Sequence, residues 1–165
     1  MRKVVVNTTP LIALSHVGRL NILKELYGEI IIIPEAVYKE LSAKEDSICK
    51  NAVERSRDWI RVDSIKNQMA KTMYKTQLHD GEVEVMILAK EIAADVVIID
   101  DANDKKHAKY LELPVTGTLG VLIKARKEGY VAELKPILRQ MVEEGIYISQ
   151  NLIEMCLKQV GEIVE

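Results

Sequence analysis

Short runs of β-branched residues alternate along the chain with longer segments of helical periodicity. The runs are KVVVN (3–7), EIIIIP (29–34), WIRV (59–62), DVVIIDD (95–101) and LPVT (113–116). Within them, VVV, IIII and VVII are apolar at consecutive positions, which is typical of strands covered by helices on both faces. Strands separated by helices form βαβ units and a parallel sheet. The pattern therefore predicts an α/β fold, a three-layer α/β/α sandwich with a central, mostly parallel sheet of about five strands.

The segments between these runs predict helices near 10–26, 34–57, 65–77, 80–93, 102–111, 117–128, 131–143 and 149–160, the second with a break around 42–46. The tripeptide IYI (146–148) predicts one further short strand. No Gly/Ser-rich linker or repeat divides the sequence, and 165 residues is close to the usual size of one domain. We therefore expect a single domain over 1–165, with its core in 3–129 and a helical C-terminal extension over 130–165.

Composition argues against several classes of binding protein. With 23 Lys and Arg against 25 Asp and Glu, the net charge of -2 gives no global field toward a polyanion, so any nucleic acid must be held locally. Six Tyr, one Trp and no Phe provide few surfaces for stacking unpaired bases. Cys49 and Cys156 form no C-x-x-C pair, which argues against a zinc knuckle or a disulfide framework and favours the cytoplasm. No uncharged run of about 18 apolar residues is present, so we expect no membrane association.

Polar residues follow the first and fourth predicted strands. In open parallel sheets, ligands bind outside the carboxyl ends of the strands, and Asn7, Asp100 and Asp101 lie at such ends. The sequence NTTP is also a plausible helix start, with a hydroxyl as the N-cap before Pro10. One aspartate can likewise cap the following helix. A single cap does not explain two adjacent carboxylates, which repel each other unless a cation lies between them.

The segment after HDG predicts an acid that faces the sheet. At 100° per residue, the apolar positions of this helix lie within about 80° of Glu82, whereas Glu84 lies in another direction. We therefore expect Glu82 to point inward and Glu84 to point outward. A carboxylate in the first turn also stabilises a helix N-terminus without any further function, so that explanation stays open for Glu82.

Glu40 is a weaker candidate, because Lys44 at i+4 offers it an ordinary surface pair. The three histidines, His16, His79 and His107, are scattered along the chain, and we interpret them as structural or surface residues.

Together these residues suggest several acids and one amide gathered from separate parts of the chain. Ligands that are all oxygen suit Mg²⁺ or Mn²⁺ rather than zinc, and such ions chiefly serve phosphoryl chemistry. Lys105, Lys106 and Lys109 follow the aspartate pair and form either a track for phosphates or a solvated helix face. TGTLG (116–120) opens another helix, but it lacks the lysine of a P-loop and is weak as a nucleotide motif.

Several of these segments resemble the PIN-domain ribonuclease family, particularly a prokaryotic branch described as nucleic-acid-binding. The segments are VVVNTTPLIAL, IIIPEAVYKEL, HDGEVEVMILAKE, VVIIDDANDKKHAKYL and LPVTGTLGVLIKARKEG, which cover most of residues 3–129. The resemblance implies carboxylates that bind divalent cations and cleave RNA hydrolytically. It also implies a toxin held inactive by a cognate antitoxin, as many members are. It assigns catalytic and metal-binding roles to Glu40, Glu82 and one or both of Asp100 and Asp101.

Asn7 departs from the family pattern, because members with demonstrated chemistry usually carry aspartate there. The amide can still offer its carbonyl oxygen to a hard cation, but it brings no negative charge and cannot accept a proton. We expect Asn7 to be a metal ligand together with the acids, in a site of reduced activity. Asp104, one helical turn beyond Asp100, is a residue that would compensate for the missing charge.

The sequence thus predicts a cytoplasmic, Mg²⁺- or Mn²⁺-dependent ribonuclease that contacts RNA through Lys105, Lys106 and Lys109. The expected protein partners are an antitoxin and a second copy in a homodimer. The leading alternative is a non-catalytic RNA-binding or regulatory module, weakened at Asn7. A phospho-accepting signalling domain fits less well, because its acid pair belongs near the first strand and the pair here follows the fourth.

Overall fold

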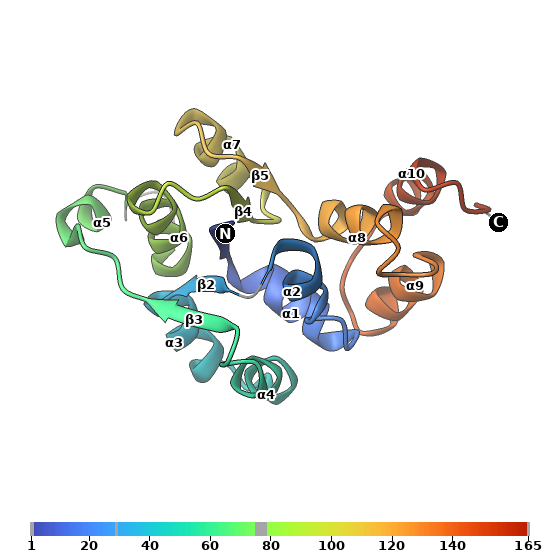
Figure 1. The fold of residues 1–165 in the computed structure, drawn as a ribbon, viewed down its shortest axis with the longest axis horizontal. Coiled ribbons are helices and arrows are strands. Elements are labelled where there is room, and N and C mark those ends of the chain that lie inside the picture. The colour runs from blue at the N-terminus through green and yellow to red at the C-terminus, as the bar shows by residue number, and fades with distance from the viewer. Residues whose placement is uncertain (1, 29, 75–78, 165) are drawn as a thin grey trace.

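The computed structural model describes residues 2–28, 30–74 and 79–164, which contain one five-stranded parallel sheet (Figure 1). Its strands are β1 (Val4–Val6), β2 (Ile31–Pro34), β3 (Ile60–Asp63), β4 (Val96–Ile98) and β5 (Val115–Thr116), in the order β3-β2-β1-β4-β5. All neighbouring strands are parallel. The predicted α/β fold is confirmed. Glu29, with which the second predicted strand began, lies outside the described residues.

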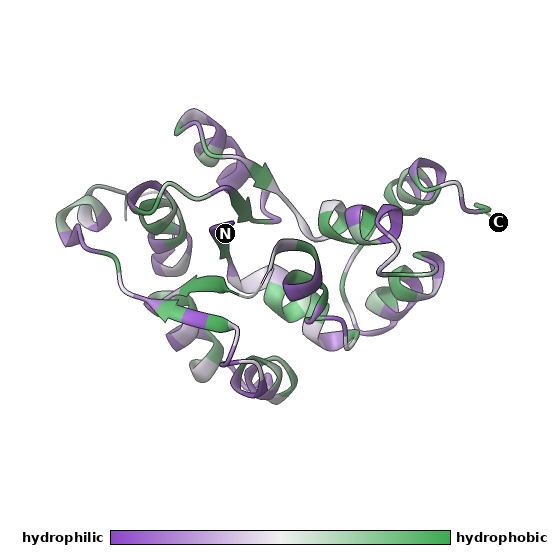
Figure 2. Cartoon of the chain, viewed as in Figure 1, coloured by the Kyte–Doolittle hydropathy of each residue, from purple (hydrophilic) through white to green (hydrophobic). Residues whose placement is uncertain are grey.

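The continuous apolar run of β1 matches its place at the centre of the sheet. Val4, Val5 and Val6 are fully buried, as expected for a strand that helices cover on both faces. Val4 pairs with Ile31 of β2 on one side and with Val96 of β4 on the other. The strands form a hydrophobic centre between helices of mixed polarity (Figure 2).

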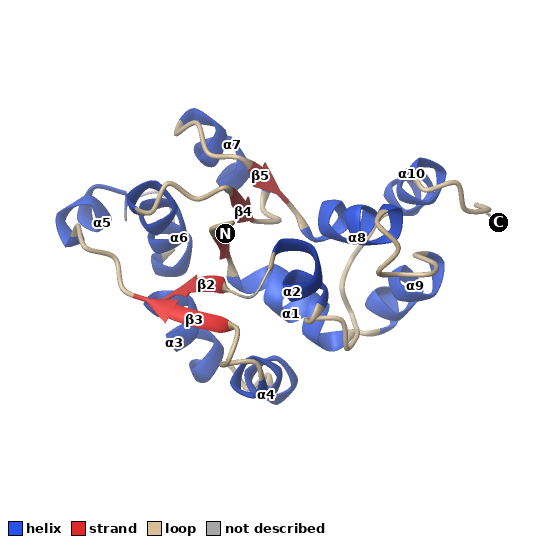
Figure 3. Cartoon of the chain, in the orientation of Figure 1, coloured by secondary structure: helices blue, strands red, loops and turns tan. Residues whose placement is uncertain are grey.

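The described residues form ten helices around this sheet (Figure 3). They are α1 (Thr8–His16), α2 (Ile22–Tyr27), α3 (Glu35–Ala43), α4 (Ser47–Arg55), α5 (Gln68–Tyr74), α6 (Asp80–Glu91), α7 (Ala102–Tyr110), α8 (Thr118–Lys127), α9 (Lys135–Glu143) and α10 (Gln150–Gln159). The helix predicted over 10–26 is two helices, because the chain turns at Gly18 with a φ of 65°. The break predicted near 42–46 is confirmed between α3 and α4. Residues 75–77 of the helix predicted over 65–77 lie outside the described ranges.

The helices lie on both sides of the sheet. α6 packs on β1 and β2 from one side, whereas α1, α2 and α8 lie on the other side, and α9 and α10 continue beyond α8 (Figure 1). The longest helix in the described ranges, α6, has 12 residues. None of the helices in these ranges has the length and hydropathy to span a bilayer.

The short strand predicted at IYI is wrong, because residues 146–148 pair with no strand in the described part of the chain. Ile146 and Ile148 pack against the core, while Tyr147 between them is 90% exposed. This alternation imitates a strand, but here it comes from a segment that packs on helices.

The strand order reverses between β1 and β4. From β1 the chain continues through α1 and α2 to β2, and from β4 it continues through α7 to β5 in the opposite direction. Such a reversal opens a crevice at the carboxyl ends of the two strands. The helices that directly follow strands begin at this edge of the sheet. α6 also begins at this edge, because it runs from there to the opposite edge, where β4 begins.

His16 connects three helices away from this edge. Its Nε2 lies 2.6 Å from Asp46 Oδ2 at the start of α4, and its Nδ1 lies 3.4 Å from Glu144 Oε2 at the end of α9. The hydrogen bond with Asp46 raises the pKa of His16 above its usual 6.5, and Glu144 adds to this against the opposing effect of burial.

A group whose pKa rises on folding stabilises the fold below its unfolded pKa, and the contribution is lost as the pH rises through the folded value. We therefore expect His16→Gln to lower the melting temperature most below pH 6.5. The difference in melting temperature between the variant and the parent protein should become smaller as the pH is raised above that value. Melting curves of both proteins between pH 5.5 and 9 measure this effect. A difference independent of pH would contradict a charged imidazolium in the pair.

Candidate nuclease site

Asn7 occupies the centre of the carboxyl edge of the sheet. Its N–H donates to the Ile98 carbonyl at 3.0 Å, so the β1–β4 ladder continues up to it. Asn7 is also the N-cap position of α1, and among the described residues its side chain makes no capping hydrogen bond. The predicted start of this helix at Pro10 is therefore wrong by two residues. Proline is tolerated at the third position because N–H groups of the first turn have no intrahelical partner.

Glu40 reaches the same edge from α3. Its Oε2 accepts a hydrogen bond of 2.9 Å from the Thr8 hydroxyl at the start of α1, and its Oε1 lies 3.4 Å from Lys44 Nζ. The surface pair with Lys44 considered for Glu40 is therefore present, together with a hydrogen bond at the edge of the sheet. Gly81 allows the approach of α6, because a β-carbon there would lie only 2.8 Å from Glu40 Oε2. The hydrogen bond holds the start of α1 against the Glu40 carboxylate, and the start of α6 lies close to the same group.

Glu82, next to Gly81, is half-buried in the first turn of α6. Its Oε2 accepts a 3.0 Å hydrogen bond from the His79 N–H, so the capping role left open for it is confirmed. Its carboxylate also raises the pKa of Asp104 in α7. Burial, the Glu82 charge and the Asp101 charge, in that order, raise the pKa of Asp104 from 3.8 to about 7.

Asp104 is the acid with the least satisfied environment. It is 1% exposed, and its Oδ2 is buried without any hydrogen-bond partner among the described residues. A buried carboxylate oxygen without a donor is costly, and two neighbouring carboxylates increase the cost. A cation beside Glu82 and Asp104 would remove both penalties.

Asp100 and Asp101 have different partners. Asp101 Oδ1 caps α7 by accepting from the N–H groups of Asn103 (2.8 Å) and Asp104 (3.0 Å). Asp100 binds the start of α8, where its Oδ1 accepts from the Thr118 N–H (2.7 Å) and its Oδ2 from the Thr118 hydroxyl (2.6 Å). Each aspartate therefore has a structural role. Because an ionised carboxylate has about four acceptor positions, these bonds leave capacity for a cation.

The prediction that Glu84 points outward is wrong. Glu84 is 6% exposed, its Oε2 lies 2.7 Å from Lys71 Nζ, and its Oε1 accepts a 3.0 Å hydrogen bond from the Ala36 N–H. The hydrogen bond with Glu84 raises the pKa of Lys71. Angular position on the helix did not place Glu84 correctly, because residues 83–89 of α6 are all buried and this helix has no solvent face at Glu84.

The three lysines of the basic run differ in exposure. Lys105 is half-buried, while Lys106 and Lys109 are exposed on α7. A β-carbon at Gly117 would lie 2.8 Å from Lys105 Nζ and 2.9 Å from Asp100 Oδ1, so glycine there allows both groups to approach the start of α8.

The acids reach this edge from several separate elements. Across the described ranges, no three Asp, Glu, His or Cys side chains form a complete metal-binding group as they stand. The contacts nevertheless connect Thr8, Glu40, Gly81 and the Glu82–Asp104 pair in sequence. Of the predicted residues, the structure therefore places Asn7, Glu40, Glu82, Asp100 and Asp101 at one edge of the sheet.

From the sequence, Asp104 was considered only as compensation for the charge missing at Asn7, and Thr118 was not considered as a site residue. In α7 the buried residues are Asp104 and Ala108, which are four positions apart on one helix face. That spacing was the available signal for Asp104. No comparable signal pointed to Thr118, because its role depends on a contact across 18 residues.

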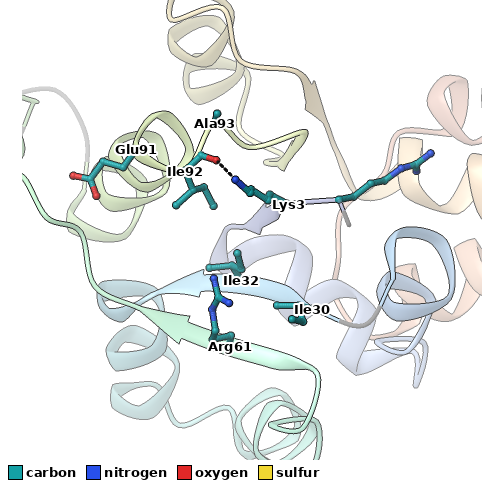
Figure 4. Close-up of a pocket in the computed structure, with 8 residues that line it drawn as sticks. Lys3, Ile30, Ile32, Arg61, Glu91, Ile92 and Ala93 are labelled. Carbon is teal, nitrogen blue, oxygen red and sulfur yellow. Dashed lines mark hydrogen bonds between the residues drawn. The ribbon is translucent and has the colours of Figure 1, made fainter.

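A cavity of about 470 Å³ lies at the opposite, amino edge of the sheet, lined by Lys3, Ile32, Arg61 and Ile92 among others (Figure 4). Lys3 Nζ donates to the Ile92 carbonyl at 3.1 Å, and Arg61 binds Asp63 through two nitrogens at 2.9 Å. Lys3 and Arg61 therefore already have hydrogen-bond partners. The cavity is not part of the carboxyl edge of the sheet where Asn7 and the acids lie, which we call the acidic edge.

Comparison with known families gives a match over most of the chain. A sequence model of the PIN domain matches residues 3–162, nearly the whole chain. A comparison with curated proteins gave no match.

Proposed function

Because the chain belongs to the PIN-domain family, whose fold is of the nuclease type and whose members generally use divalent metal ions, we propose that it is a metal-dependent ribonuclease. In this proposal it hydrolyses phosphodiester bonds of RNA with Mg²⁺ or Mn²⁺. Asn7, Glu40, Glu82, Asp100 and Asp101 are the predicted site residues, and we add Asp104 to them.

The observation that carries the proposal is the buried Asp104 carboxylate beside Glu82. Its Oδ2 has no hydrogen-bond donor in the described part of the structure, and both neighbouring acids oppose its ionisation. This is an environment that a cation would satisfy. The candidate metal ligands among the predicted site residues are carboxylate and amide oxygens, which suit Mg²⁺ or Mn²⁺.

A bound divalent ion would polarise a phosphate oxygen and lower the pKa of an attacking water. Glu82 and Asp104 would hold it from the first turns of α6 and α7, with Asn7 offering a carbonyl oxygen from the end of β1. Asp100 fixes the start of α8 through Thr118, and Glu40 fixes α1 against α6 through Thr8 and Gly81. These helix starts also stabilise negative charge, because their N–H groups point toward the edge.

Lys105, Lys106 and Lys109 are proposed to hold the RNA backbone. All three lie on α7, whose first turn carries Asp104. In a chain with net charge -2, contacts of this kind must supply the local attraction for phosphates.

Two further parts of the proposal concern partners. We propose that the protein is the toxin of a toxin–antitoxin pair in the cytoplasm, and that it forms a homodimer. The free, buried thiols of Cys49 and Cys156 fit a reducing compartment. Co-expression with the product of an adjacent reading frame, followed by cleavage assays with and without that product, tests the toxin assignment.

We expect Mn²⁺ at millimolar concentration to raise the melting temperature of the parent protein, because a ligand that binds only the folded state stabilises it. Glu82→Gln should lose most of that rise and reduce RNA cleavage by more than the roughly 10–100-fold typical of outer-shell changes. Thermal melts with Mn²⁺ and with chelator, and cleavage of labelled RNA, measure both effects. Glu133→Gln, at an exposed position outside the edge, is the matched control. Equal behaviour of the two variants would contradict the metal site.

The competing function is a non-catalytic RNA-binding module. Asn7 favours it, because the amide lacks the charge of the aspartate usual at this position. In that case metal would stabilise the protein and RNA would bind, but no cleavage would follow with either Mg²⁺ or Mn²⁺.

A further inference from the structure

A cavity of about 330 Å³ opens beside Asp100, between α1, the start of α8 and the segment before α10. This volume is at the lower end of the range of roughly 300–1,000 Å³ for small-ligand pockets. Its lining is polar around Asp100, Lys105 and the start of α8, next to the acidic edge, and apolar along the C-terminal segment, and we call these two parts its polar end and its apolar end. The cavity therefore offers two chemistries within reach of one small molecule.

The polar end contains an unpaired cation. Lys105 lines the cavity beside Gly117 and Asp100, and its ammonium has no hydrogen-bond or ion-pair partner within the ranges that the structure describes. Leu119 and Gly120 also line it, and they belong to the first turn of α8, whose N–H groups have no intrahelical acceptors. Asp100 already accepts from the Thr118 N–H, so the cation and the N–H groups of Leu119 and Gly120 are what favour a phosphate here.

The apolar end is built mainly by the C-terminal segment. Ile146, Ile148 and Leu152 line it together with Met141 of α9 and Ile12 of α1. The same cavity is lined by Lys105 and the start of α8, which a purely apolar ligand would leave unsatisfied.

Tyr147 lines this cavity and is 90% exposed. An exposed tyrosine ring offers a flat face that stacks well on a nucleobase. Tyr110 is similarly exposed at 87%, but it lies at the end of α7 and does not line the cavity. Tyr147 therefore has a position that Tyr110 lacks, beside a phosphate-binding end and an apolar wall.

We propose that this cavity binds the nucleotide adjacent to the scissile phosphate, with its base on Tyr147 and the apolar wall and its phosphate on Lys105. The assignment rests on the proposed ribonuclease function and defines how that function holds an unpaired strand. It selects single-stranded RNA, because a base in a duplex cannot enter the cavity without leaving its stack.

The test uses AMP and inorganic phosphate as probes in chelator, followed by NMR titration. AMP should perturb resonances of the cavity residues. Tyr147→Ala should weaken AMP binding by roughly 5- to 150-fold, the loss of one base–aromatic stack, and leave phosphate binding unchanged. Lys105→Ala should weaken both probes and reduce the salt dependence of binding. The controls are Tyr110→Ala and Lys50→Ala, which change an equally exposed tyrosine and an exposed lysine of α4.

Cleavage of single-stranded RNA with Mn²⁺ gives a second readout. Tyr147→Ala should raise KM with little change in kcat. Leu152→Trp, which adds bulk at a residue that is 40% exposed on the cavity wall, should do the same by blocking entry. Circular dichroism and melting curves of both variants establish that they fold.

The outcomes separate this inference from the function on which it rests. Metal-dependent cleavage that is lost in Glu82→Gln but unaffected by Tyr147→Ala and Leu152→Trp would overturn the cavity assignment and leave the ribonuclease intact. AMP binding sensitive to Tyr147→Ala, without cleavage at any metal concentration, would support the cavity and overturn the catalytic proposal. Equal AMP affinity for the Tyr147→Ala and Tyr110→Ala variants would also overturn the assignment. So would a protein partner whose binding Leu152→Trp blocks while RNA affinity is unchanged.

Discussion

Asn7→Asp is expected to make the protein less stable in chelator, more stable with Mn²⁺ and faster in RNA cleavage. Asn7 is 6% exposed at the centre of the acidic edge, so an added carboxylate without metal is repelled by the acids around it. With metal, the same charge attracts the cation strongly because water is partly excluded. Asp and Asn are equally good N-cap residues, so α1 should be undisturbed.

The expected rate increase is on the order of tenfold or more, equivalent to about 1.4 kcal/mol of transition-state stabilisation. Single-turnover cleavage and melting temperature, each with Mn²⁺ and with chelator, measure the change. Asn67→Asp is the matched control, because Asn67 is an exposed cap whose Oδ1 accepts from the Ala70 N–H at 3.0 Å. A rate and a metal dependence equal to those of the parent protein would show that Asn7 is not at a catalytic metal position.

Asp104→Asn should have the opposite effect, stabilising the metal-free protein while abolishing metal binding and cleavage. The pKa of Asp104 is raised from 3.8 to about 7, so the folded state retains a proton that the unfolded chain has released. The parent protein therefore loses stability as the pH rises from about 4 to about 7, and the full loss persists above that range. An amide does not ionise, so the variant avoids this loss.

The stability difference between the two proteins should thus grow across that range and remain constant above it. One pKa unit corresponds to about 1.4 kcal/mol, which makes several degrees in melting temperature the expected scale. Melting curves in chelator from pH 4 to 9 measure it, and Mn²⁺ should remove the difference by stabilising only the parent. A variant that is less stable at pH 8 in chelator would show that the Asp104 charge is not the source of strain.

The framework of the sheet could be predicted because its strands are apolar at consecutive positions. Val4 to Val6 can be satisfied only between two helical layers, and the topology then brings Asn7 and Asp100 to one crevice. Glu84 could not be placed in the same way. The rule of angular position assumes a helix with one solvent face, and α6 is buried on nearly all sides at that level.

The site was predictable where it depends on strand ends and not where it depends on contacts between helices. Glu40 could not be resolved from sequence, because its bond with Thr8 spans 32 residues while its pair with Lys44 is local. Asp104 required knowledge of which face of α7 is covered. The strand predicted over Ile146 to Ile148 was wrong because alternating apolar and polar residues do not specify whether the segment pairs with another strand or packs on helices.

The pairing of β1 with β4 joins positions 92 residues apart, such as Val4 and Val96. During synthesis on the ribosome, α3 and the start of α6 emerge well before β4 and α7. A nascent chain that has not yet released Asp104 from the exit tunnel cannot bring it to Glu82. An RNA-cleaving protein with this chain order would therefore remain harmless to the messenger that encodes it until most of its length had been translated.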